Sequence, residues 1–280
     1  MSMTIAVIAA GSMGSAIGRR LSSQGAQVVT SMTGRSAASR ERARTAGMEA
    51  VSDDGLARAD FFLSIVPPDK AAELAARMAT IFKTAARKPV YLDLNAISPQ
   101  TAAEVARIVT SSGAIFVDGG IIGGPPKDGQ SGPVIYLSGL VGDAAGALER
   151  HGLRSKVLAG DIGAASALKM AYAGITKGLT ALGTTMLLAA DRAGVAEALR
   201  AELAESQAEL LTRFSRAIPD MLPKAYRWMP EMAEIEQFIG RDRPEAAIFK
   251  GASGLYGQIA EDQASEPRLV PVLKRFLDLP

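Results

Sequence analysis

The chain has 280 residues, enough for two modest domains. Its 31 Lys and Arg residues against 29 Asp and Glu residues leave a formal net charge of +2, which excludes the strong basic field of a nucleic-acid or acidic-membrane partner. No cysteine is present, so disulfides, thiolate metal sites and thiol nucleophiles are excluded, and we expect no metal site.

The first predicted strand runs directly into a glycine-containing turn, VIAAGSMG, at residues 7–14. A dinucleotide-binding turn reads G-x-G-x-x-G, and here Ala9 replaces the first glycine. The second glycine lets the backbone approach a pyrophosphate and the third lets the helix pack closely on the strand, whereas the first position tolerates a small side chain. The turn lies between a strand and a helix, as the motif requires. We therefore predict that the coenzyme phosphates are bound at Gly11, Ser12, Met13 and Gly14.

The loop after the second predicted strand indicates which coenzyme is bound. An NAD site requires an acidic residue about 20 positions after the glycines, but no Asp or Glu occurs from Ser12 through Arg40. The loop TSMTGRSAASR, residues 30–40, instead offers hydroxyls and a guanidinium, which suit a 2′-phosphate. We predict that NADPH is preferred over NADH and that Thr33, Arg35 and Ser36 bind it.

The first half of the chain alternates strand and helix patterns. Apolar runs rich in β-branched residues predict strands at residues 4–9, 26–31, 60–66, 89–95, 114–118, 133–138 and 156–159. Helical spacing occurs at residues 14–24, 36–46, 69–79 and 99–112. This alternation predicts an α/β fold, with a doubly wound Rossmann domain for NADP over residues 1–161.

Two further loops follow strand ends on the side where such sheets bind ligands. In SIVPPD, residues 64–69, Val66 and Pro67 are candidates to border the nicotinamide. In DLNAISP, residues 93–99, Asn95 is a candidate to hydrogen-bond a ribose or the carboxamide. Each loop can also be a plain turn or the cap of the following helix, and the sequence leaves both interpretations open.

The second half reads as an all-α domain over residues 162–280, entered through a long helix. Its most apolar stretch, residues 163–190, contains Lys169 and Lys177, which favours a buried helix over a membrane span. With an N-terminus that lacks a leader pattern, this indicates a cytoplasmic protein. Five prolines are predicted to start or break helices: Pro219, Pro223, Pro230, Pro244 and Pro267.

The long helix has two distinct faces. One is an apolar stripe, predicted to be core, made of Leu168, Tyr172, Ile175, Leu179, Leu182 and Met186. The face around Lys169 carries small residues that permit a close approach: Ala173, Thr176, Thr180 and Gly183.

Three other side chains invite functional interpretations. His151, the only histidine, is predicted to be structural, because a general base needs an oriented partner and a cleft. Lys177 either binds a substrate anion or meets solvent. Trp228 lies either in a substrate wall or at a dimer contact, and structural and interface roles are favoured.

The motifs AAGSMG at 9–14, TGRS at 33–36 and DLNAISP at 93–99, together with three more, resemble the β-hydroxyacid dehydrogenase superfamily, which includes 6-phosphogluconate and 3-hydroxyisobutyrate dehydrogenases. The three are DGGIIGGPP at 118–126, GDIGAASALKMAYAGITKG at 160–178 and PKAYRWMPEM at 223–232. The chain is similar above all to the branch with a 6-phosphogluconate-dehydrogenase-like C-terminal domain. The resemblance implies a Rossmann domain, a long interdomain helix, a helical substrate and dimerisation domain, and a homodimer.

The resemblance also implies a general acid/base, Lys169. Hydride transfer to a carbonyl leaves an alkoxide, which a nearby ammonium can stabilise or protonate. The family motif D-x-P-V-S-G-G appears here as DGGIIGG, with Ile122 where a serine is expected, and Ala173 replaces an asparagine. The predicted substrate contacts are Ile122, Gly123, Gly124 and Tyr172.

The sequence therefore predicts an NADPH-dependent oxidoreductase that transfers hydride between the nicotinamide and a small carbonyl or hydroxyl compound of the β-hydroxyacid kind. Two alternatives remain. One is reduction of C=N bonds, as in imine reductases, where a lysine is not generally the proton donor. The other is a non-catalytic module that senses NADPH for a partner.

Overall fold

The computed structural model of the chain describes residues 3–127 and 129–278. The chain forms two compact units, Met1–Met170 and Ala171–Pro280. The predicted boundary after residue 161 lies just before helix α7 (Ala164–Arg192), whose first turns belong to the first unit.

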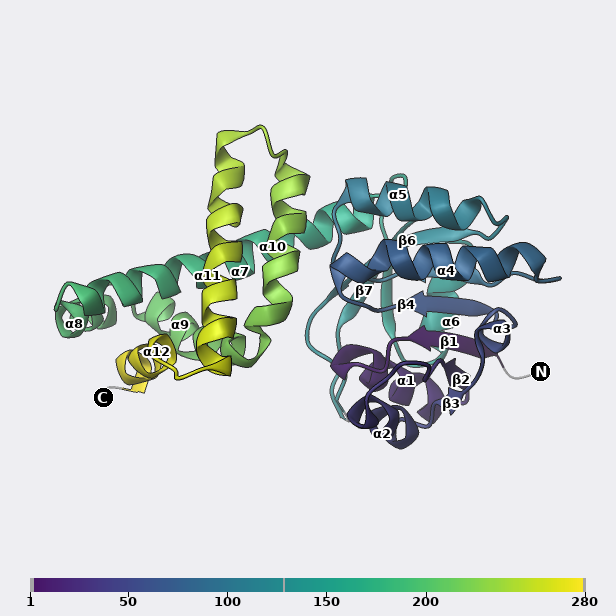
Figure 1. Cartoon of the computed structure of the whole chain (residues 1–280), viewed down its shortest axis with the longest axis horizontal. Helices are drawn as coiled ribbons and strands as arrows, with labels where there is room; N and C mark the ends of the chain where they lie inside the picture. The colour runs from purple at the N-terminus through teal and green to yellow at the C-terminus, as the bar shows by residue number, and fades with distance from the viewer. Residues whose placement is uncertain (1–2, 128, 279–280) are drawn as a thin grey trace. The chain divides into compact units, whose positions relative to one another are not determined.

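Among the described residues, eight strands form one sheet in the order β3-β2-β1-β4-β5-β6-β7-β8 (Figure 1). Neighbouring strands run parallel except for β6 and β7, which are antiparallel. The strands are β1 (Thr4–Ile8), β2 (Gln27–Thr30), β3 (Glu49–Ala50), β4 (Phe61–Ser64), β5 (Val90–Asp93), β6 (Phe116–Ile122), β7 (Val134–Gly139) and β8 (Arg154–Val157). The predicted doubly wound fold is confirmed, and its strand order reverses between β1 and β4, where such sheets bind dinucleotides.

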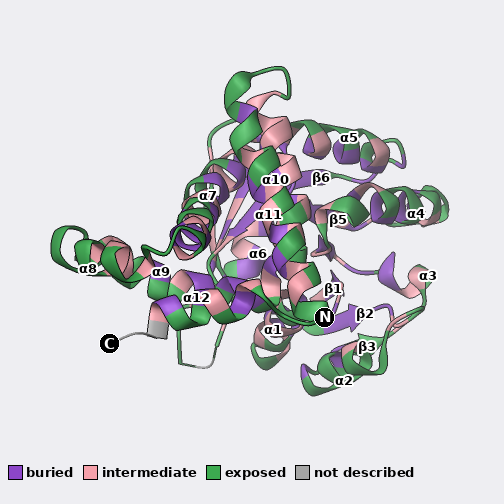
Figure 2. Ribbon diagram, turned by 60° about the vertical axis from the view of Figure 1, so that its left-hand side comes forward, coloured by how far each residue is buried: buried purple, intermediate pink, exposed green. Residues whose placement is uncertain are grey.

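Helices cover both faces of this sheet. Alternation along β1 sends Ile5 and Val7 into one hydrophobic core and Ala6 and Ile8 into the other. The first core includes residues of α1 (Ser12–Ser23), α2 (Ala37–Thr45) and α6 (Ala144–Arg150). The second includes residues of α3 (Asp53–Leu56), α4 (Ala71–Thr84) and α5 (Pro99–Thr110). Figure 2 shows α4 and α5 as amphipathic helices with separate buried and exposed faces, as their sequence spacing predicts.

The second unit is helical, as predicted. Besides α7 it contains α8 (Ala196–Ser206), α9 (Ala208–Met221), α10 (Ala225–Ile239), α11 (Ala247–Ala264) and α12 (Leu269–Asp278). The prediction that each proline starts or breaks a helix is wrong at two positions, because Pro219 lies within α9 and Pro230 within α10. In the described part of the chain, no helix has the length and apolar character needed to cross a membrane.

The two faces of α7 are used in the opposite way to that predicted. In the single chain four of the six stripe residues are exposed, with accessible fractions of 48% at Tyr172, 72% at Ile175, 60% at Leu182 and 52% at Met186, while Leu168 and Leu179 are half-buried. The small-residue face is the packed one: a Cβ added at Gly183 would lie 2.5 Å from the ring of Phe214 in α9. Small side chains let the neighbouring helices approach α7 closely, so the prediction that the stripe is core is wrong for the single chain.

Candidate active site

The glycine turn joins β1 to the start of α1. Helix α1 begins at Ser12 with Gly11 as its N-cap and has no side-chain cap and no acidic residue in its first turn. A Cβ on Gly14 would lie 2.0 Å from the carbonyl oxygen of Ala9, whereas a Cβ on Gly11 would meet no atom within 4 Å. Gly14 is therefore required for helix packing, while Gly11 leaves open space beside the positive end of the helix, where an anion is favoured.

An arginine that the sequence argument missed supports this turn. Arg42 of α2 donates from Nε to the carbonyl oxygen of Ala10 at 3.1 Å and from Nη2 to Ser39 Oγ at 2.8 Å. The contact joins segments 32 positions apart in the chain, and no local motif signals it. The turn lacks the first glycine of the motif, and Arg42 fixes its backbone through this hydrogen bond. Arg42 also brings a positive charge to the turn.

The loop after β2 offers groups for the adenosine half of a dinucleotide. Ser31 is only 4% exposed, and its hydroxyl has no hydrogen-bond partner among the described residues. Arg35 is half-buried and Thr33 is exposed, whereas Ser36 caps α2 by accepting a hydrogen bond from Ser39 N at 3.3 Å. The open space at Gly11 and the unsatisfied hydroxyl of Ser31 fit a bound dinucleotide, because a buried polar group without a partner is costly.

The predicted nicotinamide-side residues follow β4 and β5. Asn95 is 2% exposed and accepts a hydrogen bond on Oδ1 from Val66 N at 2.6 Å. Its Nδ2 donates to Ser64 Oγ at 2.8 Å and to Asp93 Oδ2 at 3.0 Å. Both amide hydrogens are therefore engaged within the protein, and Asn95 fixes the backbone at Val66. Val66 is half-buried and Pro67 is exposed at this edge of the sheet.

A buried carboxylate holds the start of α7 against β6 and β7. Asp118 is fully buried, and its Oδ2 accepts hydrogen bonds from Ser138 Oγ at 2.9 Å, Gly163 N at 2.9 Å and Ser166 N at 3.1 Å. Its Oδ1 accepts a hydrogen bond from Ser166 Oγ at 2.6 Å. A carboxylate at a helix N-terminus satisfies the free N–H groups and complements the helix dipole. In the sequence, Asp118 is recognisable only as the start of the substrate motif. The role of Asp118 as a helix cap was not predicted.

Lys169 lies three residues after Ser166, which Asp118 contacts, and it is close to β6. A Cβ on Gly120 would lie 2.9 Å from Lys169 Cβ and 3.1 Å from the carbonyl oxygen of Ala165, so α7 can approach β6 only because residue 120 is glycine. In the sheet register Asp118 pairs with Asp93, the last residue of β5, and Gly120 lies two residues further along. The backbone of Lys169 therefore lies beside β6, beyond the last paired residue of β5.

The predicted substrate contacts do not form one continuous loop. Ile122 belongs to β6 and pairs with Val134, so most of DGGIIGG is strand. Gly123 has φ +121°, a conformation that favours glycine, and Gly124 is exposed. Tyr172 belongs to the second unit. The first unit thus brings together the predicted coenzyme residues at the ends of β1, β2, β4 and β5, with Lys169 beside β6.

Lys177 does not meet solvent as an isolated cation. It forms an ion pair with Glu231 of α10, and its Nζ lies 4.8 Å from the centroid of the Trp228 ring. Trp228 also packs edge-on against Tyr256, whose hydroxyl donates to the carbonyl oxygen of Lys177 at 2.6 Å. Burial, and then the charge of Glu231, raise the pKa of Tyr256. The interpretation that Lys177 simply meets solvent is wrong, because the residue belongs to a cluster that joins α7, α10 and α11.

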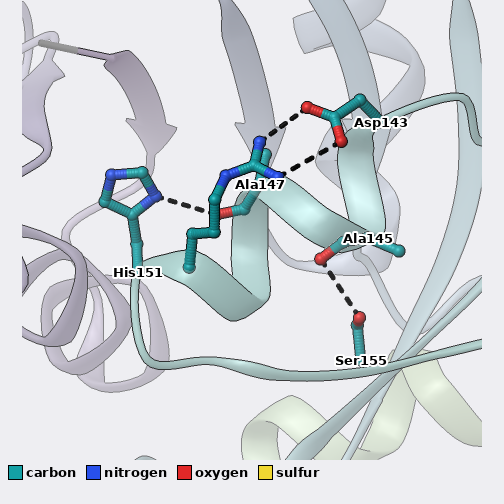
Figure 3. Close-up of polar contacts among 6 residues, drawn as sticks. Asp143, Ala145, Ala147, His151 and Ser155 are labelled. Carbon is teal, nitrogen blue, oxygen red and sulfur yellow. Dashed lines mark hydrogen bonds and ion pairs between the residues drawn. The ribbon is translucent and has the colours of Figure 1, made fainter.

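His151 is structural, as predicted. Its Nδ1 lies 2.8 Å from the carbonyl oxygen of Ala147, at the end of α6 (Figure 3). Arg150 and Asp143 form an ion pair at 2.6 Å on the same helix. Within residues 3–127 and 129–278, no group of three or more His, Asp or Glu side chains could hold a metal ion.

A doubly wound sheet with a glycine turn at its switch point, followed by a helical unit, is typical of a dinucleotide-binding protein. Residues 4–150 match the NAD binding domain of 6-phosphogluconate dehydrogenase, and residues 190–259 match a domain of unknown function, DUF1932. The chain belongs to this NAD-binding family and, with it, to the β-hydroxyacid dehydrogenase superfamily. It is an NAD(P)-dependent dehydrogenase or reductase.

Individual relatives agree with this assignment. An uncharacterised 28.5 kDa protein of Methanothermus fervidus is 26% identical over 84% of this chain and 90% of its own length. A conserved protein of unknown function, whose structure is described as similar to 3-hydroxyacid dehydrogenases, is 27% identical with a TM-score of 0.67, covering 94% of this chain and 98% of that chain.

Two enzymes of known activity share the fold. Mycobacterium tuberculosis 3-hydroxyisobutyrate dehydrogenase, solved with L-serine, has a TM-score of 0.71 at 17% identity, covering 98% of this chain and 99% of that chain. An imine reductase of Myxococcus stipitatus, solved with NADP⁺, has a TM-score of 0.54 at 20% identity, covering 99% and 100%. At these identities the likeness extends to the fold alone.

Proposed function

We propose that the protein transfers hydride between NADPH and the carbonyl or hydroxyl group of a small β-hydroxyacid-like compound, with Lys169 as general acid/base. The observation that carries this proposal is the packing of Lys169 on Gly120, at the same sheet edge as the glycine turn. Three strand spacings separate β1 from β6, about 14 Å. A nicotinamide coenzyme bound at the turn supplies the hydride chemistry. The ammonium of Lys169 then donates a proton to the developing alkoxide, or its amine accepts one from a hydroxyl.

The test of the general acid/base is Lys169→Ala, assayed with a panel of 3-hydroxy acids, β-keto acids and cyclic imines. We expect kcat on the carbonyl or hydroxyl substrate to fall about 10²- to 10⁴-fold, with NADPH affinity unchanged by calorimetry. Lys83→Ala, an exposed lysine of α4, is the matched control and should keep wild-type kcat. Turnover of an imine that Lys169→Ala leaves unaffected would reject this role and favour C=N reduction. Tight NADPH binding without turnover on any compound would favour the sensing module.

The NADPH preference rests on Arg35 and on the absence of an acidic residue between Ser12 and Arg40. A guanidinium binds a 2′-phosphate by charge-assisted hydrogen bonds, each worth about 1.5–3 kcal/mol. Arg35→Glu should therefore weaken NADPH binding about 10- to 100-fold and leave NADH binding nearly unchanged, measured by calorimetry with both coenzymes. Arg107→Glu, an exposed arginine of α5, is the control. Equal affinity of the wild-type protein for both coenzymes would contradict the preference.

We also propose that the protein is a homodimer, which the exposed apolar stripe of α7 supports, and that it acts in the cytoplasm on a small molecule. Monomeric proteins rarely expose a contiguous apolar surface of this kind. The stripe faces residues of the same chemistry if a second copy is placed against it in antiparallel orientation.

A further inference from the structure

We propose that a small phosphorylated anion binds in a basic pocket on the flank of α1, at a site separate from the coenzyme turn. The pocket has a volume of about 300 Å³ and is lined by Ser15, Ala16, Arg19, Arg20, Pro126 and Lys127. It lies between α1 and the connection from β6 to β7, so it belongs entirely to the first unit. Nothing in the proposed hydride transfer uses these residues.

One of the three cations builds the pocket wall. Arg20 donates from Nη2 to the carbonyl oxygens of Lys127 at 2.8 Å and Gln130 at 3.2 Å, and from Nη1 to that of Gly152 at 3.4 Å. These contacts tie the β6–β7 connection to α1 and hold Lys127 at the pocket. Because the acceptors are neutral carbonyls, the positive charge of Arg20 is retained there.

The other two cations are exposed, and no ion pair joins either of them to a described residue. Arg19 and Lys127 take part in no ion pair with the described residues, and no described carboxylate lines the pocket. Helix α1 contributes no acidic residue at all. Three like charges at one concave surface repel one another, and the field that they focus attracts a small anion. Among the described residues, the lining of the pocket therefore carries three positive charges and no negative charge.

The donor chemistry points to a phosphoryl group. Guanidinium and ammonium groups donate hydrogen bonds and accept none, so a ligand with several acceptor oxygens satisfies them best. An arginine fork matches two phosphate oxygens, and a lysine adds a point charge. The volume is at the lower end for ligand pockets, which suits a phosphate with a short carbon chain.

The pocket is not the phosphate site of the coenzyme. Arg19 lies seven residues beyond Ser12, about 10 Å along the helix axis. The Ser15 hydroxyl donates to the carbonyl oxygen of Gly11 at 2.7 Å, within the first turn of α1. Both anions can be bound at the same time, one at the end of α1 and one on its flank.

Titration calorimetry of the purified protein with inorganic phosphate at constant ionic strength, with and without saturating NADPH, tests this site. We expect saturable binding in both conditions. The double variant Arg19→Ala/Lys127→Ala should weaken it at least tenfold, while both side chains are exposed and their loss should not affect folding. The control Lys83→Ala/Arg107→Ala removes the same charge from the opposite face of the sheet and should stay within twofold of wild type.

Three results would overturn the proposal: no saturable phosphate binding, binding that the Arg19→Ala/Lys127→Ala variant retains, or binding that NADPH abolishes. Citrate binding as tight as phosphate would overturn the choice of a phosphoryl group. The ligand has two possible sources, a phosphorylated substrate and a separate phosphorylated effector. Phosphate that competes with the substrate in steady-state assays identifies the first, and phosphate that alters kcat without competition identifies the second.

Discussion

Gly11 and Gly14 lie in one short turn, but a methyl group would meet different surroundings at each. Gly11 has φ −73°, which any residue adopts, and open space around its Cβ position. Gly11→Ala should therefore leave the melting temperature of the coenzyme-free protein unchanged and weaken NADPH binding tenfold or more, because the methyl occupies the space of the pyrophosphate. In Gly14→Ala the methyl would overlap the carbonyl oxygen of Ala9, and unfolding in urea should show a loss of about 1–3 kcal/mol. Wild-type affinity in Gly11→Ala would contradict a phosphate site at this turn.

At the residue scale, the sequence predicted what short motifs encode. The two glycines follow a strand and open a helix, so their positions could be inferred without a structure. Arg42 and Asp118 could not, because their partners at Ala10 and at the start of α7 lie 32 to 48 positions away in the chain. Asn95 was placed at the correct sheet edge, but its pairing with Val66 depends on the adjacency of β4 and β5, which the sequence alone does not specify.

At the scale of the element, the periodicity of α7 revealed both of its faces but not which face is buried. Hydrophobicity favoured the apolar stripe, whereas packing is decided by the space that small residues leave. A Cβ at Gly178 would lie 3.1 Å from the ring of Phe249, so α11 approaches the helix on that side. Pro219 and Pro230 show the opposite limit of local signals, since both lie within helices where the sequence predicted a start or a break.

The ion pair between Lys177 and Glu231 contributes to the free energy of unfolding, and this contribution can be measured. The side chains are 17% and 8% exposed, so removal of one partner leaves an uncompensated buried charge. Lys177→Met should lower the free energy of unfolding by about 3–5 kcal/mol, and the double variant Lys177→Met/Glu231→Leu should regain most of it. Urea unfolding of both variants and of the wild type measures the coupling. If Lys177→Met costs less than the double variant, the pair is not what holds α7 to α10.

At the scale of the whole molecule, alternating strand and helix patterns were sufficient for the Rossmann unit. Seven strands were located from the sequence, and the two-residue β3 was missed because its exposed residues, Glu49 and Ala50, leave no apolar run. The helical unit was recognised by composition, but the pairing of its helices was not, because long-range contacts carry no periodic signal. The surface that remains after a single chain has folded could not be identified from the sequence for the same reason.

The exposed apolar stripe of α7 predicts how two copies of the chain pair as a homodimer. The stripe from Tyr172 to Met186 spans fifteen residues, about 21 Å of helix from the first to the last, and it is apolar along its length. In an antiparallel pair of α7 helices around a two-fold axis near Leu179, Tyr172 faces the partner's Met186, and Ile175 faces the partner's Leu182. Such a contact is isologous, the commonest arrangement in homo-oligomers.

Ile175→Asp tests this pairing, because a residue that is 72% exposed in the single chain can be replaced without disturbing its fold. Light scattering after size-exclusion chromatography should give a dimer for the wild type and a monomer for Ile175→Asp, since a carboxylate in the apolar contact would be desolvated without a partner. Ile115→Asp, at a position that is 50% exposed in the first unit, is the control and should remain dimeric. A monomeric wild type, or a dimer that Ile175→Asp leaves intact, would rule out this face as the interface.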